Sequence, residues 1–292
     1  MKLISYKDKK GNFGDDLNDW LWPKIFGEKF FTINGEIAFF GIGSILISGS
    51  NYMEEAEKYK KKVIFGTGVR SIEQSFDFDE SWDVSFLRGP FSSYIASGNC
   101  TNYISDSAYF ISLLPNYNKY INSKKKFKVS VVPYYKTLDA LDWETCCENL
   151  GWNLIKPTGN NVENFIQQIA ESEYVVCEAM HGAIIADALR IPWKRLKFQA
   201  HILEGEVVSE FKWNDWLYSI NIKSHNPILF VPNTKKTKYK IFPFLKKKKH
   251  IRTFTNQIRN SKIEYSLSTE KTFKNIIEQL KIKKKEILNK YS

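Results

Sequence analysis

The sequence predicts an α/β protein built from two Rossmann-like domains, whose parallel sheets face each other across a cleft. Short apolar, β-branched runs alternate with longer helical patterns through residues 1–220, which is typical of βαβ units. A polar stretch at 115–127 with three consecutive lysines divides this alternation into two halves. The length of 292 residues suits two domains, and the chain is long enough to bury a core without disulfides or structural metal ions.

Strands are expected where apolar residues run together, and helices where they return every three or four positions. The first half gives strand 3–6, helix 16–25, strand 37–40, helix 53–60, strands 63–65 and 84–87, helix 91–97, strand 103–105 and helix 108–114. The second half gives strand 128–132, helix 138–150, strand 152–155, helix 162–172, strand 174–177, helix 183–189, strand 193–198 and helix 210–220. We therefore expect an N-terminal domain at 1–118, a C-terminal, donor-binding domain at 127–230 and a basic tail at 231–292.

Charge is concentrated in the tail. Residues 231–292 contain 18 Lys and Arg with four Glu, a net +14, whereas residues 1–230 contain 25 basic and 28 acidic residues, a net −3. A basic tail attracts anions such as lipid head groups, nucleic acid or phosphorylated substrates, although it can also be a solvated, lysine-biased segment.

Targeting and redox signals point to a cytoplasmic protein. The N-terminal residues have no apolar core of a secretory signal, and no stretch reaches the about 20 apolar residues of a membrane span. The four cysteines, Cys100, Cys146, Cys147 and Cys177, have no C-x-x-C spacing, so we expect free buried thiols. The four histidines show no metal-ligand spacing, so we expect no metal site.

Three clusters of candidate site residues follow expected strands, where ligands bind in open α/β sheets. The first is GNFGDDLN at 11–18, a glycine-containing loop with Asp15 or Asp16 at a helix start. The second is GIGS at 41–44, with FGTG at 65–68 after the next strand. On composition alone, a helix cap and turn is the favoured explanation of the first cluster, and tight turns explain the second equally well.

The third cluster, EAMHGA at 178–183, places His181 near a helix N-terminus, where the helix dipole favours anions and an imidazole can transfer protons. Its alternative is a structural histidine. Arg88 ends another strand and could clamp a carboxylate or phosphate, or could pair with an Asp. Asp106 could cap a helix or contact substrate.

The clusters form an ordered set that resembles the polysaccharide pyruvyltransferase family, most closely its succinoglycan-type branch. The matching segments cover residues 1 to 222, nearly all of the near-neutral body. They are GNFGDDLN, GIGS, FGTG, WDVSFLRGP (82–90), SDSAY (105–109), SEYVVCEAMHGAIIADALRIPW (172–193) and FKWNDW (211–216).

The resemblance implies a GT-B-like fold, phosphoenolpyruvate as a co-substrate and donor, a hexose acceptor, and no metal or other cofactor. It implies that His181 and Arg88 hold the donor anion. Because the reaction needs proton carriers, we also assign Asp15 as acid/base or acceptor ligand. Two positions depart from the family. Ala179 stands where other branches have an arginine, so one phosphate ligand must come from elsewhere, and Lys194, Arg195 and Lys212 are the candidates. Tyr134 stands where relatives often have a histidine. The candidate substrate-binding residues are Asn12, Gly14, Asp16, Asn18, Gly43, Ser44, Gly66, Gly68, Asp106, Tyr134, Glu178, Met180, Gly182, Lys194, Arg195 and Lys212.

The function expected is transfer of pyruvate from phosphoenolpyruvate to a hexose of a surface polysaccharide, exopolysaccharide or capsule, or of its lipid-linked precursor. A pyruvate ketal forms and phosphate leaves. One alternative is a nucleotide-sugar glycosyltransferase on the same fold, with Glu178 on the nucleotide ribose. A second is a non-catalytic protein whose tail binds membrane or nucleic acid.

The basic tail also has apolar residues at roughly helical spacing. For 241–252 we expect contact with an anionic membrane surface. This contact would hold the enzyme peripherally at the inner, cytoplasmic face of the membrane. For 270–292 we expect a helix that packs back across the domains with solvated lysines. No specific nucleic-acid partner is expected.

Overall fold

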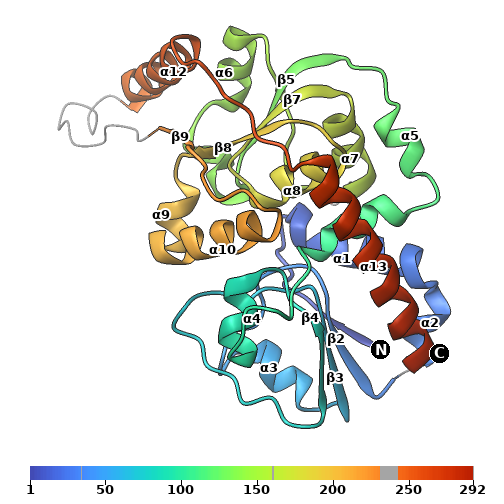
Figure 1. The fold of residues 1–292 in the computed structure, drawn as a ribbon. Helices are drawn as coiled ribbons and strands as arrows, with labels where there is room; N and C mark the ends of the chain where they lie inside the picture. The colour runs from blue at the N-terminus through green and yellow to red at the C-terminus, as the bar shows by residue number, and fades with distance from the viewer. Residues whose placement is uncertain (34, 160, 231–242, 292) are drawn as a thin grey trace.

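The computed structural model describes residues 1–33, 35–159, 161–230 and 243–291, with side chains from 248 onward in the last range. Two parallel sheets form the molecule, one in each half (Figure 1). The first has four strands in the order β1-β2-β3-β4, and the second has five in the order β6-β5-β7-β8-β9. The predicted α/β fold with two parallel sheets is confirmed.

Apolar runs become the buried strands of the first sheet, and all four residues of β2 are buried. All neighbouring strands pair in parallel, which requires crossovers between them. The elements of the first half are β1 (Lys2–Ile4), α1 (Phe13–Phe26), α2 (Glu28–Ile33), β2 (Ile37–Phe40), α3 (Asn51–Ala56), β3 (Lys61–Phe65), β4 (Trp82–Phe86), α4 (Pro90–Ser97), the 3-10 helix η1 (Ser107–Leu113) and α5 (Tyr117–Ile121).

In the second sheet, β6 lies on one side of β5, and β7, β8 and β9 follow on its other side, so the strand order switches between β5 and β7. Ligands in open α/β sheets bind at such a switch point, beyond the carboxyl ends of the strands. The elements are β5 (Phe127–Val132), the 3-10 helix η2 (Tyr135–Ala140), α6 (Trp143–Leu150), β6 (Asn153–Leu154), α7 (Val162–Ala170), β7 (Ser172–Cys177), α8 (Met180–Ala188), β8 (Trp193–Lys197), α9 (Ala200–Glu204), α10 (Glu206–Ser219), β9 (Ile228–Leu229), α12 (Pro243–Arg259) and α13 (Glu270–Tyr291).

Two predicted elements were wrong. Segment 103–105 forms no strand, because Tyr103 makes a single parallel bridge to Leu87 and the chain then turns into η1. The single helix expected at 138–150 is two helices, η2 and α6, because Leu141 is extended between them. The short elements α2, α5, α9 and β9 were not predicted.

The C-terminal helix α13 runs from the second half down to the first (Figure 1). It buries Ile276, Leu280 and Ile287, and Asp83 of β4 accepts hydrogen bonds from Lys290 (2.8 Å) and Tyr291 (2.7 Å) near its end. Residues 270–291 therefore pack back across both halves.

None of the helices in the described ranges combines the length and apolarity needed to cross a bilayer. Cys146, Cys147 and Cys177 are free and buried as expected, but the prediction was wrong for Cys100, whose thiol is free and exposed.

Candidate functional site

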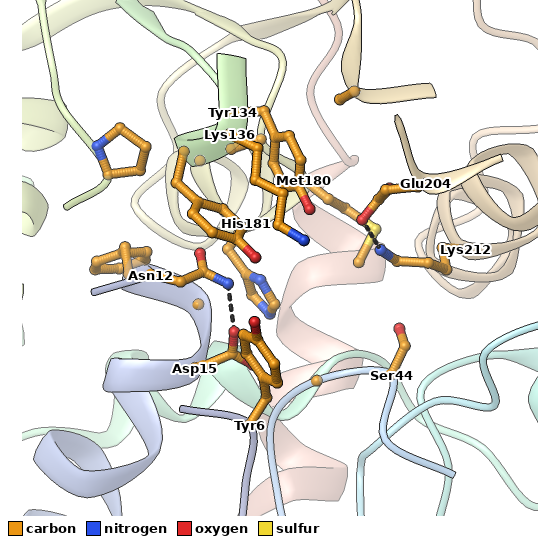
Figure 2. A pocket seen from close by; sticks show the side chains of 18 of the residues that line it. Tyr6, Asn12, Asp15, Ser44, Tyr134, Lys136, Met180, His181, Glu204 and Lys212 are labelled. Atoms are coloured by element: carbon orange, nitrogen blue, oxygen red, sulfur yellow. Dashed lines mark hydrogen bonds and ion pairs between the residues drawn. The ribbon is translucent and has the colours of Figure 1, made fainter. Parts of the chain in front are cut away.

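A cavity of about 360 Å³ opens between the two halves, at the carboxyl ends of their strands. Tyr6, Asn12 and Asp15 enter it from the first half, and Tyr134, Lys136 and His181 enter it from the second half (Figure 2). It therefore lies at the switch point of the second sheet, which is where the fold favours ligand binding. The predicted residues that line it are Asn12, Gly14, Asp15, Gly43, Ser44, Tyr134, Glu178, Met180, His181, Gly182 and Lys212.

His181 is the second residue of α8, the helix that follows β7, and its side chain is 17% exposed. Burial, together with the positive charges of Lys212 and Arg88, lowers the pKa of His181 to about 3, although the Glu204 carboxylate opposes the shift. The imidazole is therefore neutral at pH 7 while no anion is bound. A bound anion would favour the protonated ring, so this pKa is expected to rise with an anionic ligand.

Asp15 lies at the start of α1, across the cavity from the second half. Asn12 donates a side-chain hydrogen bond to its carboxylate. Burial raises the pKa of Asp15 to about 7, although the Asn12 hydrogen bond and the charge of Lys212 oppose the shift. A carboxyl group with a pKa near 7 can both accept and donate a proton at physiological pH.

Asp16 and Asn18 form hydrogen bonds with the backbone of the loops next to the cavity. The Asp16 carboxylate accepts a hydrogen bond from the Asn12 backbone N–H (3.0 Å), which closes the first turn of α1. Asn18 is fully buried and hydrogen-bonds both the N–H (2.8 Å) and the C=O (3.0 Å) of Ile42. It thereby holds the GIGS loop against α1, so its contribution to the cavity is indirect.

The structure does not place Arg88 on the cavity. Arg88 is fully buried, and its Nε lies 3.0 Å from Oδ2 of Asp215 in α10. Gly68 packs on the guanidinium, since a Cβ there would come within 2.2 Å of Cζ, and Gly66 packs on Phe86 and Ser107. The arginine follows a strand, as expected, but it forms its ion pair with an aspartate 127 residues away in the sequence.

A family model for polysaccharide pyruvyl transferases matches residues 5–193, which is most of the chain. The chain belongs to the polysaccharide pyruvyl transferase family. The predicted family is thus confirmed.

A relative is the succinoglycan biosynthesis protein ExoV of Rhizobium meliloti (strain 1021), which is 31% identical over 222 residues. These residues are 76% of this chain and 66% of the relative, so the match spans just under two thirds of the relative's length. No solved structure matches the chain.

Glu178 links three loops through hydrogen bonds. Its Oε1 accepts the backbone N–H groups of Gln199 and Ala200 (both 2.8 Å). Its Oε2 accepts the backbone N–H of Tyr134 (2.9 Å) and the Thr137 hydroxyl. Both oxygens are occupied by protein donors, which disfavours the alternative in which Glu178 binds a nucleotide ribose.

Of the three cationic candidates in the second half, one reaches the cavity. Lys212 lines it and forms an ion pair with Glu204 (2.8 Å) in which both side chains are 14% exposed. Lys194 is buried in β8, and Arg195 pairs with Glu210 (2.7 Å) and covers the Trp213 ring. Neither Lys194 nor Arg195 is therefore placed to bind a phosphate in the cavity, as the arginine of other branches was expected to do from the position of Ala179.

Two cations that line the cavity were not predicted from the sequence. Arg70 follows the FGTG loop by two residues, and Lys136 lies in η2 after β5. Neither forms an ion pair with a residue in the described ranges. Both follow strands of the sheets, so a search for cations within five residues of each strand end could have found them.

Tyrosines supply most of the aromatic lining. Tyr6, Tyr52 and Tyr135 were missed, and Tyr134 was predicted. Burial raises the pKa of Tyr134, and so does the neighbouring Glu204 carboxylate, so that its hydroxyl stays protonated at neutral pH. Phenol rings with hydroxyl groups suit a saccharide, which has both apolar C–H faces and hydroxyls.

Asp106 lies next to His181 and is not among the residues that line the cavity. It is fully buried, and its Oδ1 accepts the Ala108 N–H (2.9 Å) at the start of η1. Its Oδ2 lies 3.8 Å from Nε2 of His181. The helix-capping interpretation of Asp106 is thus confirmed.

Proposed function

We propose that this protein transfers the pyruvyl unit of phosphoenolpyruvate to a hexose of an exopolysaccharide or its lipid-linked precursor, forming a ketal and releasing phosphate. The observation that carries the proposal is one cavity in which His181, Asp15 and the cations Arg70, Lys136 and Lys212 come together. Family membership gives the pyruvyl group, and the relative's name points to succinoglycan-type polysaccharide.

The reaction needs cations, proton carriers and a saccharide surface in one place. A proton adds to C3 of the enol, which makes C2 electrophilic. One sugar hydroxyl attacks C2 and a second closes the ketal as the C–O bond to phosphate breaks. The two hydroxyl protons are balanced by the proton gained at C3 and the proton carried away by phosphate or solvent.

The donor is a polyanion, so we assign its binding to the unpaired cations. Arg70 and Lys136 take the place that the sequence gave to Arg88, because Arg88 is bound by Asp215. Lys212, which is partly neutralised by Glu204, faces the same space as His181 (Figure 2). Cations fixed around a leaving phosphate stabilise charge that develops in the transition state.

Proton transfer is assigned to His181 and Asp15. The neutral imidazole becomes a stronger base once the donor anion is bound, and the Asp15 carboxyl exchanges a proton near pH 7. His181→Ala removes one such group and is expected to lower kcat by on the order of 10²–10³ while the fold is retained.

A donor screen tests the function. Phosphate release is measured with phosphoenolpyruvate and an oligosaccharide-lipid acceptor, and sugar transfer is measured with UDP- and GDP-sugars. Turnover with phosphoenolpyruvate, lost in His181→Ala, supports the proposal.

Arg70→Met and Lys136→Met should raise KM for phosphoenolpyruvate. Lys128→Met is the control, because Lys128 is an exposed lysine paired with Glu173, and it should leave this KM unchanged. Turnover with a nucleotide sugar instead would make the protein a glycosyltransferase.

Membrane contact through 241–252 remains a proposal, and the side chains of 241–247 lie outside the described residues. What supports it is the basic surface of α12, where Lys248, Lys249 and Arg252 are exposed. Co-sedimentation with anionic liposomes at low and high salt tests it. Binding should weaken with salt and when the lysines of 246–249 are replaced, but not when the exposed Lys281 is. If both replacements reduced liposome binding equally, residues 241–252 would not be the membrane-binding segment.

A further inference from the structure

We propose that Asp106 is the positioning residue of His181: its Oδ2 accepts the Nε2–H of the imidazole and so leaves Nδ1 as the nitrogen that exchanges protons in the cavity. The inference deepens the proposed function and rests on it for the role of His181. The tautomer that it specifies can be measured without turnover.

The first support is the geometry of two buried polar atoms. Nε2 of His181 and Oδ2 of Asp106 lie 3.8 Å apart, and neither has a hydrogen-bond partner among the described residues. A buried polar atom without a partner costs about 1–3 kcal/mol. A shift of less than about 1 Å would join them at normal hydrogen-bond length and remove both costs together.

The second support is the fixed orientation of the carboxylate. Asp106 caps η1, and its Oδ1 accepts the backbone N–H of Ala108 at 2.9 Å. This hydrogen bond commits Oδ1 to the helix and leaves Oδ2 turned toward His181. The carboxylate is completely buried, so water or substrate in the cavity does not reach it.

The third support is the position of the other ring nitrogen. Nδ1 faces Gly14, because a Cβ built there would come within 2.1 Å of it. Gly14 lines the cavity and precedes Asp15. Nδ1 therefore faces the cavity on the side of Asp15, the other proposed proton carrier, and Nε2 faces the protein interior.

Charges around the pair favour a neutral imidazole beside an ionised carboxylate near neutral pH. Arg88 and Lys212 disfavour a protonated His181, while Glu204 favours it. Burial raises the pKa of Asp106 to about 6, Arg88 opposes this shift and Asp215 adds to it. At about pH 8 Asp106 is ionised, so it can only accept a hydrogen bond from Nε2.

The test is nitrogen-15 NMR of the imidazoles at about pH 8, with His181 assigned by the signals lost in His181→Gln. The wild-type ring is expected as the Nε2–H tautomer. In Asp106→Asn, the Ala108 N–H keeps the amide oxygen at the Oδ1 position, so the NH₂ group faces Nε2. Nε2 must then accept, and the ring is expected to switch to the Nδ1–H tautomer.

Turnover supplies a second readout. Asp106→Asn should lower kcat by about 10²–10⁴, as expected when a catalytic imidazole is held in the wrong tautomer, with little change in KM for phosphoenolpyruvate. Ser107→Ala is the matched control, because it removes a buried hydroxyl next to Asp106 that has no partner in the described part of the chain. It should keep both the tautomer and kcat.

A wild-type Nδ1–H tautomer, or a tautomer unchanged by Asp106→Asn, would overturn the inference. The wild-type spectrum decides even if the variant fails to fold. If the tautomer switches but phosphoenolpyruvate gives no turnover with any acceptor, the positioning of His181 stands and the proposed function fails.

Discussion

Gly14 and His181 are in such close contact that a methyl group on Gly14 would come within 2.1 Å of the imidazole Nδ1. Gly14 lies in α1 of the first half, and His181 lies in α8 of the second half. The distance between the two halves at the cavity is therefore set partly by a residue without a side chain. Asp15, next along α1, is brought to the same place.

Gly14→Ala should impair turnover far more than folding. Gly14 is helical, so alanine fits its backbone and favours the helix by about 0.5–1 kcal/mol, which offsets part of the cost of moving the ring. Displacing the imidazole should lower kcat by on the order of 10² or more. Gly35→Ala is the control, because a Cβ there meets nothing within 4 Å. Normal kcat in a folded Gly14→Ala variant would show that His181 need not stay where it is.

Breaking the buried pair of Arg88 and Asp215 should destabilise the fold. Asp215 also accepts hydrogen bonds from the backbone of Phe91 and Ser92 (both 2.9 Å) at the start of α4. Removing one partner of such a pair costs about 3–5 kcal/mol. In urea unfolding, Asp215→Ala should cost more than Arg88→Met, because it leaves a buried guanidinium and a helix start without their acceptor.

The same two variants also test the assignment of Arg88. If Arg88→Met were as stable as wild type and raised only KM for phosphoenolpyruvate, Arg88 would bind the donor, as the sequence predicts. That result would contradict the structural role given to the arginine here.

The raised pKa of Asp15 predicts a pH-dependent stability. Burial raises this pKa to about 7, whereas an aspartate in an unfolded chain titrates near about 3.9. Between these values the folded protein holds a proton that the unfolded chain has released. The side chain therefore stabilises the fold fully below about pH 4, and this contribution is lost as the pH rises to about 7.

Asp15→Asn isolates this contribution. The free energy of unfolding of wild type minus that of the variant should fall by on the order of a few kcal/mol between pH 4 and pH 7 and then stay level. His181 titrates in both proteins, so its direct contribution cancels. A difference that does not change with pH would mean that Asp15 ionises as an exposed carboxyl group does.

Helix α13 should contribute to stability through its inner face. Leu280 is fully buried and Ile282 is 51% exposed on the same helix, so the two form a matched pair. Leu280→Ala should lower the free energy of unfolding by about 2–5 kcal/mol, and Ile282→Ala by no more than about 0.5 kcal/mol. Equal effects in urea unfolding would indicate that α13 leaves the body in solution.

The sequence was most informative where local patterns determine structure. Strand 37–40 was predicted at its observed bounds, because four consecutive apolar residues fit a strand buried on both faces. His181 and Asp15 were found because each follows a strand and begins a helix. The short helix α9 was missed because its sequence, AHILE, has one turn and no helical period to detect.

Partners distant in sequence were not predictable in the same way. Arg88 follows a strand just as a ligand would, but its partner Asp215 comes from α10 and is visible only in the folded chain. Arg70 and Lys136 reach the cavity through loops whose path no periodicity reveals. The contact of His181 with Asp106 also joins two halves of the chain that local patterns treat separately.

The central claim, that pyruvate moves from phosphoenolpyruvate to a sugar, is tested most directly by following the donor's C2 carbon. The protein is incubated with phosphoenolpyruvate carrying carbon-13 at C2 and an oligosaccharide-lipid acceptor, and the product is analysed by NMR. We predict a labelled ketal carbon bonded to two sugar oxygens and one phosphate released per ketal, both lost in His181→Ala. Phosphate release without labelled saccharide, or a labelled enol ether that never closes to a ketal, would contradict the account.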